Sequence, residues 1–221
     1  PDGTRIAYQE TDARHIPLFT IVHEGTPEFS TETHRYPFPG KANAKVRLGV
    51  VSVDGGETKW LDIAEPGAAF YLGRVNWQGG GAVLVQILNR EQNSLRLERV
   101  DVATGARVLV LEETSKSWVN LHDDLRSLPT GEILWTSERT GFRHIEILKA
   151  DGSGRRALTS GTWQVDSVLA VDSKRREVWF ASGKADISGA RIYRVGIDDG
   201  AIVEVTPEPG THKAFVASDG D

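Results

Sequence analysis

The residues that could perform chemistry are spread thinly along this chain of 221 residues. The serine nucleophile of many hydrolases needs the spacing Gly-x-Ser-x-Gly, which holds the serine on a strained turn between a strand and a helix. Gly152-Ser153-Gly154 lacks that spacing, and no other segment has it. Because no acyl intermediate can form without a nucleophile, we predict that the chain contains no catalytic residues.

Metal chemistry is not indicated by the spacing of potential ligands either. No two histidines have an i, i+2 or His-x-x-x-His spacing with a carboxylate placed for a metal. Turns such as Asp198-Asp199-Gly200 lack the Asp-x-Asp-x-Asp-Gly ladder of calcium loops. The chain has no cysteine, which excludes thiolate ligands and disulfides. We predict no metal site and no bound cofactor.

Several isolated polar residues have structural interpretations. We place the adjacent pair Glu112-Glu113 in a solvated turn at the end of an outer strand. His144 alternates with apolar residues on a predicted strand, which favours a structural hydrogen bond over a ligand role. Three arginines near carboxylates are expected to connect neighbouring repeats through ion pairs: Arg90, Arg139 and Arg143.

The elements that must position any site form an internal repeat. A strand, an Asp/Gly turn and a second short strand recur four times, and the turn aspartates lie 47, 50 and 47 residues apart. Period-2 alternation of apolar residues around such turns is a hairpin signal. The turn aspartates are Asp54, Asp101, Asp151 and Asp198.

A second hairpin strand precedes each copy, and weaker strands precede these in the later repeats. We expect the weaker strands at 71–77, 118–121 and 163–171. Each unit thus has about four short strands in about 48 residues, which is the size of a propeller blade. No segment shows helical periodicity over two turns. The sequence therefore predicts an all-β fold, a partial β-propeller of about four antiparallel four-stranded blades.

The first unit is longer than the others because of residues 9–45, a loop-rich stretch. Within it, the polar segment 26–33 is either a plain surface loop or a contact for a partner domain or subunit. The chain opens on Pro1-Asp2-Gly3, closes near Ser218-Asp219-Gly220 and lacks methionine. Both ends fall at the same phase of the repeat, so we expect a bounded piece of a longer protein.

Charge and hydropathy exclude some classes of partner. The formal net charge is -5 and the pI about 5.7, with both signs scattered. Nucleic-acid binding, which needs a basic stripe, is therefore not expected. There is no run of about 18 apolar residues, so no transmembrane helix is predicted in this chain. The compartment is left open.

Six segments, in their order and spacing, resemble the N-terminal propeller of the dipeptidyl peptidase IV branch of the prolyl oligopeptidase family. The resemblance covers essentially the whole chain, and the WVNLHDDL segment is more similar to the dipeptidyl peptidase 8/9-like and bacterial members than to the type enzyme. The segments are YPFPGKANAKVRLGVV at 36–51, VQILNREQN at 85–93, WVNLHDDL at 118–125, WTSERTGFRHI at 135–145, LTSGTWQVD at 158–166 and TPEPGTH at 206–212.

This resemblance implies an eight-bladed propeller capping an α/β-hydrolase domain that removes N-terminal dipeptides with Pro or Ala in second place. It also implies that the Ser, Asp and His of catalysis, and the glutamate pair that holds the substrate's ammonium group, lie outside this chain. Residues 1–221 would then be a fragment of the N-terminal propeller domain without a hydrolase domain. The expected partners are the peptide substrate, the remaining blades, the C-terminal α/β-hydrolase domain and a second copy in a homodimer.

The resemblance further implies a substrate-facing loop after Trp118-Val119. We expect Trp118, Asn120, His122 and Asp123 to contact substrate there. The type enzyme has an aromatic residue and an arginine in place of His122 and Asp123, so its contacts do not transfer directly. Alternatively, His122 and Asp123 only shape the propeller opening.

The function that we predict is a non-catalytic segment that admits peptides to a serine exopeptidase and positions them. The alternative is a propeller that binds proteins or peptides without any associated catalysis. A propeller glycosidase is a third option, since it requires only two carboxylates about 5 to 9.5 Å apart across a pocket.

Overall fold

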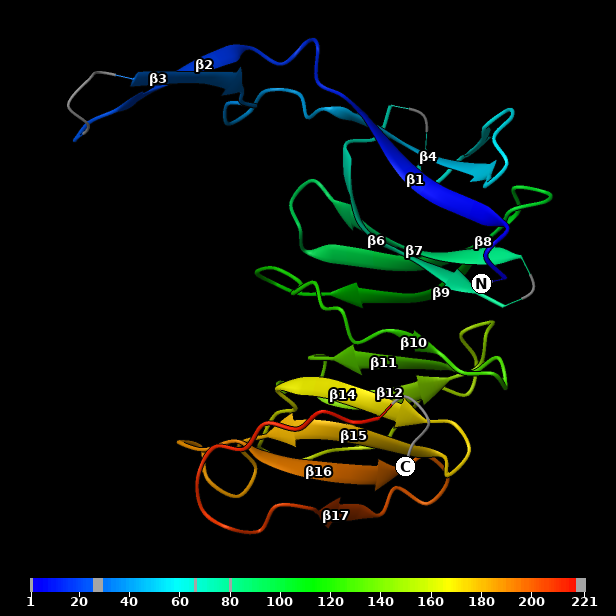
Figure 1. Ribbon diagram of the computed structural model, residues 1–221, viewed down its shortest axis with the longest axis vertical. Helices are drawn as coiled ribbons and strands as arrows, with labels where there is room; N and C mark the ends of the chain where they lie inside the picture. Colours follow the sequence, from blue (N-terminus) through cyan, green and yellow to red (C-terminus); the bar gives the residue numbers. More distant parts are fainter. Residues whose placement is uncertain (1, 26–29, 66, 80, 218–221) are drawn as a thin grey trace.

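The computed structural model describes residues 2–25, 30–65, 67–79 and 81–217 (Figure 1). Pro1, residues 26–29 of the polar segment 26–33, and Ser218-Asp219-Gly220 lie outside the described residues. Within the described ranges there are seventeen β-strands and no helix, and therefore no helix that could span a membrane.

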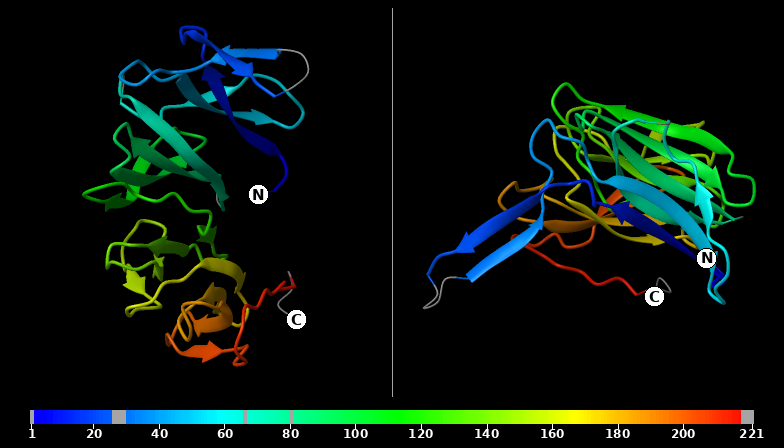
Figure 2. Two further views of the ribbon diagram at one scale, coloured as in Figure 1. Left: turned by 90° about the vertical axis from the view of Figure 1, so that its left-hand side faces the viewer. Right: turned by 90° about the horizontal axis from the view of Figure 1, so that it is seen from above.

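The strands form four antiparallel sheets, which we call blades 1 to 4, and one separate hairpin. Blade 1 has the strand order β1-β4-β5, and the separate hairpin β2-β3 is inserted between β1 and β4. These strands are β1 (Arg5–Asp12), β2 (Leu18–His23), β3 (Ser30–Arg35), β4 (Lys45–Ser52) and β5 (Lys59–Leu61). Figures 1 and 2 show the hairpin projecting away from the blades.

The other three blades each have four strands in sequence order, β6-β7-β8-β9, β10-β11-β12-β13 and β14-β15-β16-β17. The prediction of a partial propeller is confirmed. Blade 2 contains β6 (Phe70–Gln78), β7 (Ala82–Asn89), β8 (Ser94–Asp101) and β9 (Arg107–Thr114). Blade 3 contains β10 (Arg126–Ser127), β11 (Ile133–Ser137), β12 (His144–Leu148) and β13 (Arg156–Ala157). Blade 4 contains β14 (Ser167–Asp172), β15 (Glu177–Ser182), β16 (Arg191–Gly196) and β17 (Ile202–Glu204).

Two details of the strand prediction were wrong. Blade 1 has three strands among the described residues, not four. The first strand of blade 3 is β10, whereas residues 118–121 form a loop. The reason is a hydrogen bond back to the preceding blade, because the Val119 amide donates to the Gln92 carbonyl at 2.8 Å. The segment 118–121 is thus held at the β7–β8 turn, and β10 pairs with β11 instead.

Each blade buries a face against its neighbour, and blades 2 and 3, which have a neighbour on each side, bury both faces. On β7, Val83 and Val85 pack toward blade 1, whereas Leu84 and Leu88 pack toward blade 3. This explains why β7 is an almost continuous apolar run, since a sheet covered on both faces has no solvated side. Three apolar clusters, one at each junction, stack the blades into a curved row (Figure 2).

The tryptophans differ in how far they are buried in the core. Trp135 is buried at the junction of blades 2 and 3, and Trp77 and Trp163 pack against their clusters. Trp118, in contrast, is 65% exposed, and Trp60 is 37% exposed. An exposed indole is unusual enough to mark a candidate surface for binding.

The backbones of blades 2 and 3 approach each other closely at Gly152, in the β12–β13 turn. Gly152 has a φ of +84°, and a Cβ there would overlap the backbone oxygen of Val110 on β9. Gly131 has a similar φ of +86° but has open space around it. The two glycines therefore separate the cost of the left-handed backbone from the cost of the contact.

We expect Gly152→Ala to lower the free energy of unfolding by at least about 3 kcal/mol, because it adds a backbone clash to the strain of a positive φ. Gly131→Ala should cost only about 1 kcal/mol, from the strain alone. Urea titration followed by tryptophan fluorescence measures both. Equal losses for the two variants would show that the blades do not approach each other closely at this turn.

Candidate functional site

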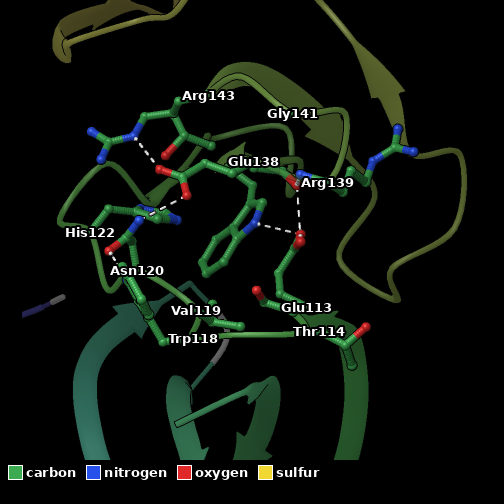
Figure 3. A pocket seen from close by; sticks show the side chains of 14 residues that line it. Glu113, Thr114, Trp118, Val119, Asn120, His122, Glu138, Arg139, Gly141 and Arg143 are labelled. Carbon is green, nitrogen blue, oxygen red and sulfur yellow. Dashed lines mark hydrogen bonds and ion pairs between the residues drawn. The ribbon is translucent and has the colours of Figure 1, made fainter.

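The candidate site is a groove of about 350 Å³ at the junction of blades 2 and 3. Two loops form it, the β9–β10 connection at 115–125 and the β11–β12 turn at 138–143 (Figure 3). We call it the Trp118 groove. Three of the four residues predicted to contact substrate line it, namely Trp118, Asn120 and His122.

A chain of polar contacts holds the outer wall of the Trp118 groove. The Trp118 indole N–H donates to Asn120 Oδ1 at 3.2 Å, and Asn120 Nδ2 donates to Glu138 Oε2 at 2.8 Å. Glu138 also lies 3.6 Å from the Arg143 guanidinium. Figure 3 shows these four side chains joined in a row along the rim. The row fixes the direction of the exposed indole.

His122 lies deeper and is held by its loop. Its ring meets Trp135 edge to face with a centroid distance of 4.2 Å, and its Nδ1 accepts the Asp124 amide at 3.3 Å. The proton of the neutral ring is therefore on Nε2, which has no hydrogen-bond partner among the described residues. Burial lowers the pKa of His122 to about 4, although the Asp124 carboxylate opposes this shift. At neutral pH the wall of the groove thus contains an uncharged imidazole ring.

Asp123, the fourth predicted residue, points elsewhere. Its carboxylate pairs with Arg74 on β6, and its side chain is 76% exposed outside the groove. The Arg74 guanidinium lowers the pKa of Asp123, so the pair stays ionised. The structure therefore does not bring Asp123 together with the other three.

Asp124, which the sequence did not single out, is the residue that anchors this loop. It is 7% exposed, and its two oxygens accept the Thr136 hydroxyl and the Val168 amide, both at 3.1 Å. These partners belong to blades 3 and 4. These two hydrogen bonds hold the loop of eleven residues against two blades at once, although it contains no proline to stiffen it.

The prediction for Glu113 was wrong, because this residue is buried rather than solvated. It is 7% exposed and accepts the Trp135 indole N–H at 3.1 Å and the Ser137 hydroxyl at 3.0 Å. It also pairs with Arg155, which in turn binds Glu146 Oε2 at 2.6 Å. Glu113 comes from blade 2 and the others from blade 3, so this buried network joins the two blades beneath the groove.

The arginines expected to tie the repeats together have different partners. Arg139 pairs with Glu146 at 2.8 Å within blade 3, and Arg143 lies near Glu138 in the same turn. Arg90 reaches blade 1, but its partners are Asn43 Oδ1 and the Lys41 carbonyl rather than carboxylates. Arg155 connects blades 3 and 2 through Glu113, and Arg176 connects blades 4 and 3 through Glu132 at 2.9 Å.

His144 makes the structural contacts that the alternating pattern predicted. Its Nδ1 is 3.1 Å from the Thr159 hydroxyl, and its Nε2 is 3.1 Å from the Gly161 carbonyl oxygen. Among the described residues, no three His, Asp or Glu side chains are arranged to hold a metal ion. The Trp118 groove is lined by an exposed indole, an amide, an imidazole and charged side chains that pair with one another.

A comparison between repeats shows what is unusual about Trp118. Thr114-Ser115 precede it by the same spacing with which Thr159-Ser160 precede Trp163. Trp163 packs inward, with ring centroids 5.1 Å from His144 and 6.2 Å from Phe180. Trp118 occupies the equivalent place in the preceding repeat but turns to solvent. The same local sequence thus supports a core residue in one blade and an exposed one in the other.

Comparisons with known proteins show similarity to one family along the whole chain. The family described as "Dipeptidyl peptidase IV (DPP IV) N-terminal region" matches residues 1–221. The inactive dipeptidyl peptidase 10 of Mus musculus is 29% identical over 87% of this chain and 26% of its own length. A probable dipeptidyl peptidase 4 of Aspergillus fumigatus is 28% identical over 88% of this chain and 28% of its own length.

The fold matches solved structures as well. The crystal structure of Porphyromonas gingivalis dipeptidyl peptidase 4 superposes with a TM-score of 0.83 at 24% identity, covering 94% of this chain and 30% of that one. The chain thus spans little more than a quarter of the length of these curated relatives.

The buried neutral state of His122 should be visible in the stability of the protein. The folded pKa of about 4 lies below the ordinary value of 6.5, so the unfolded chain binds the proton more readily. The contribution of His122 to the free energy of unfolding is fully present above pH 6.5. It decreases by up to about 3 kcal/mol as the pH falls from 6.5 to 4.

We expect His122→Phe, which keeps an aromatic ring against Trp135, to remove this part of the pH dependence. Urea unfolding at pH 7, 6, 5 and 4 gives the free energy of unfolding of both proteins. The contributions of the carboxylates, which both proteins share, cancel in the difference. A difference that does not change between pH 7 and 4 would contradict a buried, neutral His122.

Proposed function

The chain belongs to the dipeptidyl peptidase IV N-terminal region family, and from this premise we propose that it holds peptide substrates for a serine exopeptidase without taking part in the chemistry. The reaction that we propose for the whole protein is the release of N-terminal dipeptides of the type Xaa-Pro or Xaa-Ala. Residues 1–221 then form a fragment of its N-terminal propeller domain, and further blades and the α/β-hydrolase domain lie elsewhere in the longer protein.

The observation that carries this proposal is the outward position of Trp118. An indole that is 65% exposed at the rim of a groove offers a flat apolar surface to a passing peptide. Asn120 adds an amide to the same groove, and the His122 ring forms part of its wall. Because His122 is uncharged at neutral pH, it does not repel the free ammonium group that an exopeptidase substrate carries.

The sequence and the buried carboxylates also support a positioning role. The chain has no Gly-x-Ser-x-Gly segment, and the buried carboxylates beneath the groove are already occupied by Arg139 and Arg155. A carboxylate saturated in this way is a poor general base, since its lone pairs and charge are committed. We therefore assign binding to this chain and bond cleavage to another part of the protein.

Turnover of Ala-Pro-p-nitroanilide tests the proposal. We expect the full-length protein to release p-nitroaniline and residues 1–221 alone to be inactive. In the full-length protein, Trp118→Ala should raise KM about three- to tenfold with kcat nearly unchanged, as for the loss of a contact made equally to substrate and transition state.

Asp123→Asn is the matched control, because Asp123 is in the same loop but faces Arg74 outside the groove. Its KM should stay within about twofold of the wild-type value. Turnover by residues 1–221 alone would refute the division of roles. Equal effects of the two substitutions would refute the contact at Trp118.

The alternative function, a propeller that binds peptides or proteins without catalysis, is favoured by one observation. The relative at 29% identity is named an inactive dipeptidyl peptidase, so membership of the family does not by itself imply turnover. An inactive full-length protein that still binds the peptide Ala-Pro-Ala-Ala through Trp118 would support this second function.

A second copy of the protein is a further partner that we propose, in contact with the β2-β3 hairpin. Leu18 and Val22 lie on this hairpin with 63% and 52% of their surfaces exposed. Sedimentation velocity of the full-length protein should show a dimer that Val22→Glu weakens and that Ser173→Glu, in an exposed turn of blade 4, leaves intact. A monomer at all concentrations, or equal behaviour of both variants, would contradict the proposal.

A further inference from the structure

A second and larger groove, of about 900 Å³, lies at the junction of blades 1 and 2. Its apolar lining includes Val46 on β4, Trp60 on β5, Phe70 on β6, and Ile63 between β5 and β6. Arg90 of the β7–β8 turn also lines it. We call it the Arg90 groove. It shares no lining residue with the Trp118 groove, so the proposed substrate site does not account for it.

The charges around the Arg90 groove are not balanced. Of the charged groups that line it, Arg47 pairs with Glu10 and Glu65 pairs with Arg107. Lys41, Lys45 and Arg90 form no ion pair with any described residue, and only Asp62 remains as an unpaired carboxylate. Three cations therefore face one anion on a chain whose net charge is -5. This local reversal of sign concentrates anions at the groove.

Two polar groups of the groove are held in place by the fold. The Arg90 guanidinium donates to Asn43 Oδ1 and, at 2.9 Å, to the Lys41 carbonyl oxygen. The Asn43 carbonyl oxygen is 3.0 Å from His15 Nε2. Asn43 Nδ2 is buried yet has no hydrogen-bond partner among the described residues. A buried amide donor without a partner is costly, and an incoming acceptor such as a peptide carbonyl would relieve that cost.

We propose that the Arg90 groove binds an acidic peptide segment that also carries apolar side chains. The apolar lining suits aliphatic or aromatic side chains, Asn43 Nδ2 suits a backbone carbonyl, and the three unpaired cations suit Asp or Glu. A small anion such as phosphate would require donors that converge on one point, whereas these cations are spread along a large groove. Nucleic acid would require a longer basic stripe than three residues supply. The site does not depend on the proposed peptidase function.

The experiment uses the full-length protein and a fluorescein-labelled probe, acetyl-Glu-Asp-Leu-Phe-Asp-Glu-amide. The blocked N-terminus lacks the ammonium group that an exopeptidase substrate needs, so failure here is separate from failure of the proposed function. We expect saturable anisotropy binding that weakens as salt rises from about 0.05 to about 0.5 M, because the contacts are exposed ion pairs. Peptides with Gln and Asn for the acids, or with Ser-Ser for Leu-Phe, should bind more weakly.

The paired substitution Lys41→Gln/Lys45→Gln should weaken binding of the probe about five- to tenfold. The matched control, Lys174→Gln/Lys213→Gln, removes the same charge from exposed sites outside the groove and should leave binding unchanged. Thermal unfolding of both pairs verifies that each variant is folded.

Three results would overturn the proposal. They are no binding of the probe at up to about 1 mM, equal binding of the neutral peptide, and equal losses from the two pairs of substitutions. Displacement of the probe by inorganic phosphate at the same concentration would identify a small-anion site instead. Displacement by a short duplex RNA, but not by unlabelled peptide, would identify a nucleic-acid site, and either result would also overturn it.

Discussion

The burial of blade faces against neighbouring blades is the constraint on which the rest of the structure depends. A four-stranded antiparallel sheet of this size is not stable alone, because its apolar side chains need a second layer. The three apolar clusters supply that layer at each junction, and each draws side chains from two blades. Inner strands such as β7 are therefore largely apolar on both faces, and many of the polar groups lie in the turns and connections.

The Trp118 groove follows from that division. At the junction of blades 2 and 3, the apolar cluster gives way to the network of Glu113, Arg155 and Glu146 as the loops are approached. Such a network adds little net stability, but it is strongly directional, and leaving one charge unpaired would be costly. It fixes how the two blades meet, and Asp124 fixes the loop above them. The exposed indole of Trp118 therefore has a rigid base.

The sequence predicted the repeat and the hairpins well because those signals are local. Alternation and Asp/Gly turns act within a few residues, so the four turn aspartates could be found by inspection. The segment 118–121 also alternates, but its hydrogen bond to Gln92 decided its conformation. The burial of Glu113 and the role of Asp124 depend on Arg155 and Val168, which are 42 and 44 residues away. No local pattern shows such partners, and only three of the four expected groove residues meet.

The β7–β8 turn lines the Arg90 groove and is hydrogen-bonded to the loop of the Trp118 groove. Arg90 faces one groove, while the carbonyls of Gln92 and Asn93 hold the loop of Trp118 through the amides of Val119 and Ser115. Asn89 Oδ1 makes the turn rigid by accepting two amides at 3.0 Å. A ligand that displaces this turn from one side must alter the affinity on the other, and thermodynamic linkage requires that the effect be reciprocal. The β7–β8 turn is thus the place through which binding in one groove would favour or oppose binding in the other.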